Sequence, residues 1–83
     1  MKSLFSIAGS VDLRGVSCPV NAVRAKESIA ALGDDERIEV IVDEGQALVN
    51  VVRSINDAGY RIYKSQPREN SVAIIVGKRK TVG

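Results

Sequence analysis

The chain contains one cysteine, Cys18, and no histidine. A single cysteine excludes a disulfide within the chain, and it is too few for a structural zinc site, which draws on several Cys and His ligands. Without histidine there is also no Cys–His dyad and no Ser–His–Asp triad. What remains for Cys18 is chemistry that a thiolate performs without a neighbouring base. We expect neither a metal nor a cofactor.

The position of Cys18 favours the thiolate. It stands where a predicted strand gives way to a helix whose first position suits Pro19. A thiol at a helix N-terminus faces unpaired backbone N–H groups and the positive end of the helix dipole. The dipole supplies about 0.3–1 kcal/mol at an exposed site, whereas half-ionising an ordinary thiol at neutral pH needs ~2 kcal/mol. Nearby cations have to supply the rest, and the candidates are Arg14, Arg24 and Lys26, of which Arg24 fits an ordinary surface charge best. The plainer alternative is a small buried apolar cysteine.

Apolar periodicity and Gly/Pro punctuation divide the chain into six short elements. They are, in order, a strand at 11–14, a helix at 19–32, a strand at 37–42, a helix at 43–58, a strand at 60–65 and a strand at 71–76. The last two strands should form an antiparallel hairpin around the polar stretch 66–70. The two helical crossovers predict parallel strands with both helices on one face. The expected fold class is α/β, a two-layer sandwich of βαβαββ order with a mixed four-stranded sheet, and the strand order stays open.

Residue types at the helix ends predict where the helices begin and end. Asp43 and Glu44 should open the second helix, where acidic groups suit the dipole. Gly33 and Gly59 should each stand just past a helix C-terminus. Because only three residues are aromatic, the core should consist mostly of Val, Ile, Leu and Ala.

The length and the net charge of the chain limit the classes of molecule that it could bind. The 83 residues allow one small domain, and 12 Lys and Arg against 10 Asp and Glu leave a net charge of +2. The basic residues are scattered, and Tyr60 and Tyr63 fall on opposite faces of a strand, so we expect no direct nucleic-acid partner. No apolar run reaches the ~18–20 residues of a membrane span, and the N-terminal run is too short for a signal peptide. We therefore expect a cytoplasmic protein without membrane contact, and a monomer, although the sequence does not specify the oligomeric state.

Residues 12–19, which read D-L-R-G-V-S-C-P, resemble the signature D-L-R-G-x-x-C-P-x-P of the TusA/SirA-like (YhhP-type) sulfur carriers. Residues 22–26, 38–43 and 58–60 are similar to the family's first helix, second strand and helix-ending glycine. The resemblance covers about residues 10–78 of a single domain, 1–83. The chain departs from the pattern at Asn21, where the family has its second proline, and at residues 43–45, which read D-E-G where the family commonly has D-D-P.

The resemblance implies a βαβαββ sandwich in which Cys18 relays sulfane sulfur as a persulfide. The partners would be a donor protein of the cysteine desulfurase or rhodanese type and a sulfur-acceptor protein. Arg14, Pro19, Asn21 and Lys26 would support the thiolate or dock partners. Such a chain acts within a relay rather than as a stand-alone enzyme, and the pathway stays open between tRNA thiolation, molybdenum cofactor synthesis and sulfur oxidation. The alternative is a non-catalytic adaptor or redox-regulatory module of the same fold.

Overall fold

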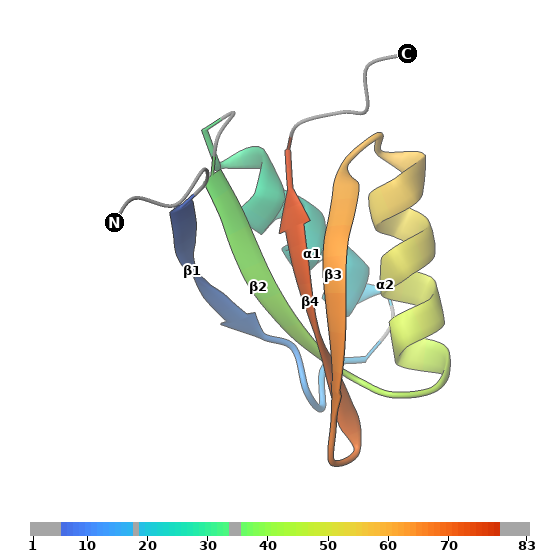
Figure 1. Ribbon diagram of the computed structural model, residues 1–83. Helices are drawn as coiled ribbons and strands as arrows, with labels where there is room; N and C mark the ends of the chain where they lie inside the picture. The colour runs from blue at the N-terminus through green and yellow to red at the C-terminus, as the bar shows by residue number, and fades with distance from the viewer. Residues whose placement is uncertain (1–5, 18, 34–35, 79–83) are drawn as a thin grey trace.

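The computed structural model describes residues 6–17, 19–33 and 36–78. Its elements, in chain order, are β1 (Ser6–Asp12), α1 (Val20–Ala30), β2 (Glu36–Asp43), α2 (Gln46–Asp57), β3 (Arg61–Arg68) and β4 (Ser71–Gly77). The predicted βαβαββ order is therefore confirmed. The two helices cover one face of a four-stranded sheet, with α1 behind the strands and α2 beside β3 in the view of Figure 1.

The strand order is β1-β2-β4-β3. The pair β1–β2 is parallel, and β4 runs antiparallel to both of its neighbours, β2 and β3. β2 and β3 consequently share a direction, as the helical crossover predicts, but the final strand lies between them. The two-layer α/β sandwich with a mixed sheet is thus confirmed, and the structure adds the order that the sequence left open.

The core lies between the sheet and the helices and is aliphatic, as the composition predicts. Alternate residues of β2, namely Ile38, Val40 and Val42, point towards the helices and are buried. They meet buried residues of the other elements and of the segments that connect them: Leu13, Ala25, Ile29, Leu32, Val51, Ile55, Ile74 and Val76. The packing of this cluster holds α1 and α2 against the sheet. Because Leu13 belongs to the cluster, it also anchors the turn that precedes α1.

The first strand lies earlier in the chain than the predicted 11–14. β1 ends at Asp12, and the backbone N–H of Leu13 continues the ladder by donating to the Ile41 carbonyl at 2.7 Å. The chain then reverses through a turn in which Val16 N–H donates to the Leu13 carbonyl at 3.1 Å. Gly15 has φ +77° in this turn, a conformation that glycine adopts without the strain a side chain would bring. Gly15 therefore ends the extended segment, but Arg14 belongs to the turn rather than to the strand.

The helix ends agree with the sequence only in part. α1 starts one residue after Pro19, which is its N-cap, and it ends at Ala30, so Gly33 is not the residue that follows its cap. The predicted acidic start of α2 is wrong: its N-cap is Gly45, and its first turn holds no acidic residue. Asp43 stays in β2, paired with Ser71 of β4. The end of α2 is as predicted, because Gly59 follows the cap with φ +86°.

The hairpin β3–β4 is antiparallel as predicted, with a shorter connection than 66–70. β3 continues to Arg68, leaving only Glu69 and Asn70 to make the turn, and Asn70 takes a left-handed φ of +62°. Pro67 interrupts the run of backbone donors, but β3 is an edge strand, where a missing N–H is tolerated.

Candidate functional site

The turn after β1 is closed by a local ion pair. The Asp12 carboxylate accepts hydrogen bonds from the backbone N–H of Arg14 at 3.0 Å, from its Nε at 2.9 Å and from its Nη2 at 2.6 Å. The side-chain hydrogen bond from Arg14, followed by the backbone one, lowers the pKa of Asp12 to about 2. The same contact raises the pKa of Arg14. The Arg14 guanidinium is thus balanced by a neighbouring charge.

A second carboxylate ties this turn to the sheet. Asp43, at the end of β2, accepts a hydrogen bond from the backbone N–H of Gly15 through Oδ2 at 2.8 Å. The Leu13 side chain, only 2% exposed, is anchored in the core on the other side of the turn. Residues 12–16 are therefore held by the burial of the Leu13 side chain and by the hydrogen bond from Gly15 to Asp43, and we call them the braced turn. Sequence reasoning assigned Asp43 to helix capping and missed this bond between residues 28 positions apart.

Two backbone hydrogen bonds of helical spacing are accepted by residues that precede α1. The backbone N–H of Asn21 donates to the Ser17 carbonyl at 3.1 Å, and that of Val23 donates to the Pro19 carbonyl at 3.1 Å. Pro19 makes no side-chain cap. Cys18 falls outside the described residues, so its predicted exposure and lowered pKa stay predictions. Of its two neighbours, Ser17 follows the turn of residues 12–16, and Pro19 is the N-cap of α1.

Asn21 is the unexpected residue of this segment. Its side chain is buried, with 1% of the residue exposed, at the first turn of α1. Oδ1 accepts a hydrogen bond from the backbone N–H of Ala22 at 2.7 Å. Among the residues described, Asn21 Nδ2 is the one buried side-chain nitrogen or oxygen without a hydrogen-bond partner. An unpaired buried donor costs about 1–3 kcal/mol, so the fold carries a penalty at this position.

Lys26 lies further along α1 and is partly buried. It is six positions after Val20, which corresponds to a rise of about 9 Å along the helix axis. A long side chain at this depth can lie along apolar surface while its ammonium group stays in water. Lys26 is thus within electrostatic range of the helix start rather than in its first turn.

A sequence model of the family described as Sulfurtransferase TusA matches residues 10–78. The chain belongs to the TusA family. The match spans every element from the end of β1 to β4, together with the braced turn and α1.

Two relatives place this TusA-family chain among similar proteins. It is 29% identical over 68 residues to a protein of Methanocaldococcus jannaschii named as a putative sulfur carrier protein, an alignment that covers 82% of this chain and 91% of the other. Its fold is similar to the crystal structure of a SirA-like protein from Desulfitobacterium hafniense, with a TM-score of 0.72 and 22% identity. That superposition covers 87% of this chain and 99% of the other.

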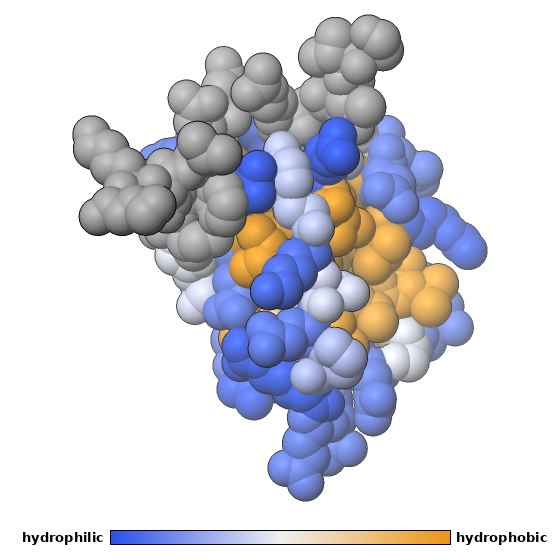
Figure 2. Space-filling view, in the orientation of Figure 1, coloured by the Kyte–Doolittle hydropathy of each residue, from blue (hydrophilic) through white to orange (hydrophobic). Residues whose placement is uncertain are grey.

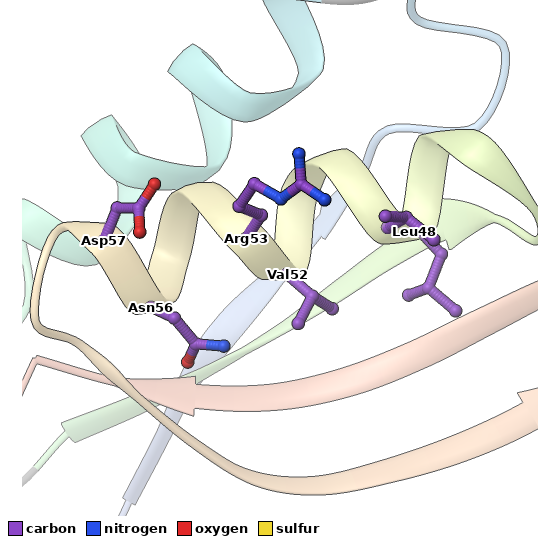
Figure 3. Close-up of a pocket in the computed structure, with 6 residues that line it drawn as sticks. Leu48, Val52, Arg53, Asn56 and Asp57 are labelled. Atoms are coloured by element: carbon purple, nitrogen blue, oxygen red, sulfur yellow. The ribbon is translucent and has the colours of Figure 1, made fainter.

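The TusA-family chain also has an open groove of about 570 Å³ along α2. All its lining residues come from this helix: Leu48, Val49, Val52, Arg53, Asn56 and Asp57. Figure 3 shows Arg53 and Asp57 projecting to one side of the helix, and Val52 and Asn56 to the other. Figure 2 shows an apolar area where α2 lies. Leu48 and Val52 are partly buried because one side of each packs against the core.

The two tyrosines lie in different surroundings, although Tyr60 comes just before β3 rather than on the strand as predicted. Tyr60 packs against the core, whereas Tyr63 has the Arg37 guanidinium carbon 3.4 Å and that of Arg61 5.4 Å from its ring centroid. One tyrosine is thus partly buried against the core, and the other is covered by arginine side chains. The pair does not form the continuous stacking platform that single-stranded nucleic acid requires.

Within 6–17, 19–33 and 36–78, no group of three or more Cys, Asp or Glu side chains could hold a metal ion. Neither α1 nor α2 is long and apolar enough to cross a membrane. Of the predicted site residues, Arg14, Pro19 and Asn21 lie within eight consecutive positions of a turn and a helix start, and Lys26 follows about one and a half turns later.

Proposed function

We propose that this chain is a sulfur carrier that binds sulfane sulfur as a persulfide on Cys18 and passes it between two proteins. Membership of the TusA family and the sulfur carrier named among its relatives support the carrier role. The observation that carries the proposal is the braced turn of residues 12–16, which precedes residue 18 and the N-cap of α1 in the chain.

The chemistry fits the residues of the chain. In loading, the Cys18 thiolate attacks the outer sulfur of the donor persulfide, a new S–S bond forms, and the donor's own S–S bond breaks. The donor leaves as a thiolate, and the outgoing transfer repeats the exchange towards an acceptor thiolate. No external oxidant or base is needed, which suits a chain without histidine. With one cysteine, no second thiol of the chain can attack the persulfide and release sulfide.

The partners follow from this chemistry. The donor is a persulfide-forming protein of the cysteine desulfurase or rhodanese type, and the acceptor presents a thiol in its turn. A reducing compartment keeps a lone thiol available, so we place the carrier in the cytoplasm. A pull-down with the persulfidated protein, against the same protein with reduced Cys18, would identify acceptors and with them the pathway.

Mass spectrometry tests loading directly. The protein is incubated with cysteine persulfide or with a cysteine desulfurase and cysteine, and the intact mass is measured before and after reduction. We expect a gain of one sulfur atom that dithiothreitol reverses, and none in Cys18→Ser, which should fold normally because a hydroxyl can replace the thiol at a helix start. If the wild-type mass is unchanged, the chain is an adaptor or redox-regulatory module instead. If Cys18→Ser unfolds, the cysteine is structural.

A further inference from the structure

The edge of the sheet that β3 forms lies beside the groove along α2. β3 pairs with β4 on one side, and among the described residues no strand pairs with its other side. Alternate residues of an edge strand direct their backbone N–H and C=O groups away from the sheet, where a further strand can bind them. Figure 1 shows β3 and α2 side by side. Backbone hydrogen bonds and an apolar surface are therefore offered next to each other.

The apolar surface consists of side chains of α2. Val49 is 45% exposed, which is unusual for a large apolar residue of a helix that packs on a sheet. Leu48 and Val52 line the same groove, and one side of each packs against the core. Figure 3 shows Val52 projecting from α2 towards the strands. A strand added beside β3 would therefore have these side chains above one of its faces.

The other face of β3 is basic. β3 contains three cationic residues and no acidic one, and Arg61, Lys64 and Arg68 are all exposed. Their partners in β4 alternate with the buried core residues Ile74 and Val76, so the three cations share the face that points away from the helices. Side chains of a strand paired with β3 would meet these cations on that face.

The neighbouring strand β2 adds charge of both signs to this face. The guanidinium carbon of Arg37 lies 3.4 Å from the centroid of the Tyr63 ring, which adds a cation next to β3. Of the carboxylates of β2, Glu39 pairs with Arg68 at 3.1 Å, and Asp43 accepts the hydrogen bond from Gly15. No acidic residue belongs to β3 itself, so the side chains that an added strand meets first are basic.

We propose that β3 and the groove together dock an extended segment of another protein in which apolar and acidic residues alternate. In a strand, successive side chains point to opposite faces, so the apolar set would lie against Leu48, Val49 and Val52, and the acidic set against the cations of β3. β3 is the edge opposite to β1, from which the braced turn continues. Docking at β3 therefore extends the sheet away from that turn and does not depend on sulfur transfer.

The charge of β3 disfavours a second copy of the chain as the occupant. Antiparallel pairing of two β3 strands would bring like charges together, which destabilises cross-strand pairs. Residues 1–5 and 79–83 contain three basic residues and no acidic one, so neither end of the chain supplies an acidic segment. Basic residues and Pro67 are devices that protect an edge from aggregation, and the same cations select a partner of opposite charge.

A nucleic acid is the other polyanion that a basic surface can attract. Its backbone has no group that fills an apolar groove, and the ring of Tyr63 is covered by Arg37 rather than open for stacking by a base. The groove and the edge together thus favour a peptide strand over a nucleic acid.

The test uses a synthetic peptide in which Glu and Val alternate over about eight residues, the length of β3. A second peptide of the same length, in which Lys and Val alternate, is the control for charge. Binding is measured by fluorescence anisotropy at low and at physiological ionic strength, and the bound surface is mapped by amide chemical shifts of the isotopically labelled protein. We expect the acidic peptide to bind, less tightly as salt rises, and to shift amides of β3 and α2.

Two pairs of variants assign the binding to the two faces of the added strand. Lys64→Glu should weaken binding of the acidic peptide about fivefold at low salt, whereas Arg24→Glu, the same change on an exposed residue of α1, should not. Val49→Gln should weaken it about fivefold by removing apolar contact, and Val23→Gln, at an α1 position that is also 45% exposed, should not. Should Val49→Gln not fold, Val49→Ala replaces it.

Several results would overturn the proposed docking site. They are no binding of the acidic peptide up to about 1 mM, equal binding of the basic peptide, amide shifts confined to α1 or β1, and unchanged binding in both Lys64→Glu and Val49→Gln. If an oligothymidylate displaces the acidic peptide and binds more tightly, the surface is a nucleic-acid site instead. If sedimentation shows a dimer that Val49→Gln dissociates, a second copy is the occupant. None of these measurements involves Cys18, so the proposed sulfur carrier role stands or falls separately.

Discussion

The hydrogen bond from Gly15 to Asp43 allows the contribution of the braced turn to be measured. Asp43→Ala removes the acceptor at 2.8 Å and leaves the backbone of the turn held from the Leu13 side only. An exposed hydrogen bond contributes about 1 kcal/mol net to folding. For a domain of this length that corresponds to a fall in melting temperature of about 4–8 °C.

The same free energy predicts the effect on function. If the bond from Gly15 to Asp43 stabilises the observed conformation of the turn by ~1 kcal/mol, its loss reduces the population of molecules with that conformation at most about fivefold. We therefore expect Asp43→Ala to load sulfur up to about fivefold more slowly at a temperature well below its melting point. Asp43→Asn keeps a neutral oxygen acceptor and should show less than half of each effect.

A control variant on β2 distinguishes the loss of this particular hydrogen bond from the loss of a negative charge on the strand. Glu39 is also a carboxylate of β2, and it pairs with Arg68 of β3 at 3.1 Å. Glu39→Ala should change the melting temperature by little, because exposed ion pairs contribute about 0–1 kcal/mol, and it should leave loading unchanged. If Asp43→Ala is less stable but loads at the wild-type rate, the bond does not position the reactive segment. If neither quantity changes, the bond does not contribute in solution.

Three further predictions concern the same segment. The pKa of Asp12 is lowered in the folded state from 3.8 to about 2, so its pairing with Arg14 stabilises the fold above pH 3.8, and this stabilisation is lost as the pH falls towards 2. The difference in stability between Asp12→Asn and the wild type should therefore disappear over that pH range. A difference that stays constant would contradict this prediction. Arg14→Ala and Lys26→Ala should slow transfer more at low salt than at high salt, since exposed charges are screened over ~8–10 Å; a salt-independent loss would indicate packing instead. Asn21→Pro should retain loading but impair transfer to a dedicated partner. Proline would stabilise the fold by about 0.4–1 kcal/mol through the lower entropy of the unfolded chain, but it also removes the backbone hydrogen bond from Asn21 to Ser17. We therefore expect little change in melting temperature, and a marked rise would show that this hydrogen bond contributes nothing.

The element order and fold class could be predicted because each element carries its own periodicity. Alternating Ile38, Val40 and Val42 identify a half-buried strand, and Gly59 marks the end of α2 by a conformation that suits glycine. The strand order could not be predicted, because either edge of the parallel pair offers the same backbone groups to a hairpin. The start of β1 was placed too late because residues 6–10, S-I-A-G-S, lack the alternation that identifies a strand.

The candidate site could be named from its motif, whereas the contacts that hold the neighbouring turn in place were missed. Residues 12–19 are adjacent in sequence, so their pattern is visible without a structure. The role of Asp43 depends on β1 and β2 ending side by side, and an acidic residue before a helix equally suits a cap. The burial of Asn21 was also missed, because a polar residue in a first turn normally faces water; only its register with Ala25 and Ile29 carried the signal.

The place of β4 in the sheet has a consequence for how the protein is made. β4 is the sixth element in the chain and the most buried strand, and it joins β2 to β3. The core cannot close while only the earlier elements have left the ribosome, since β2 and β3 then have no common neighbour. Asp43, which braces the turn, pairs in the sheet with Ser71, the first residue of β4. Residues 12–16 are synthesised before β4, so in a truncated chain this turn would lack the support that the complete sheet gives to Asp43.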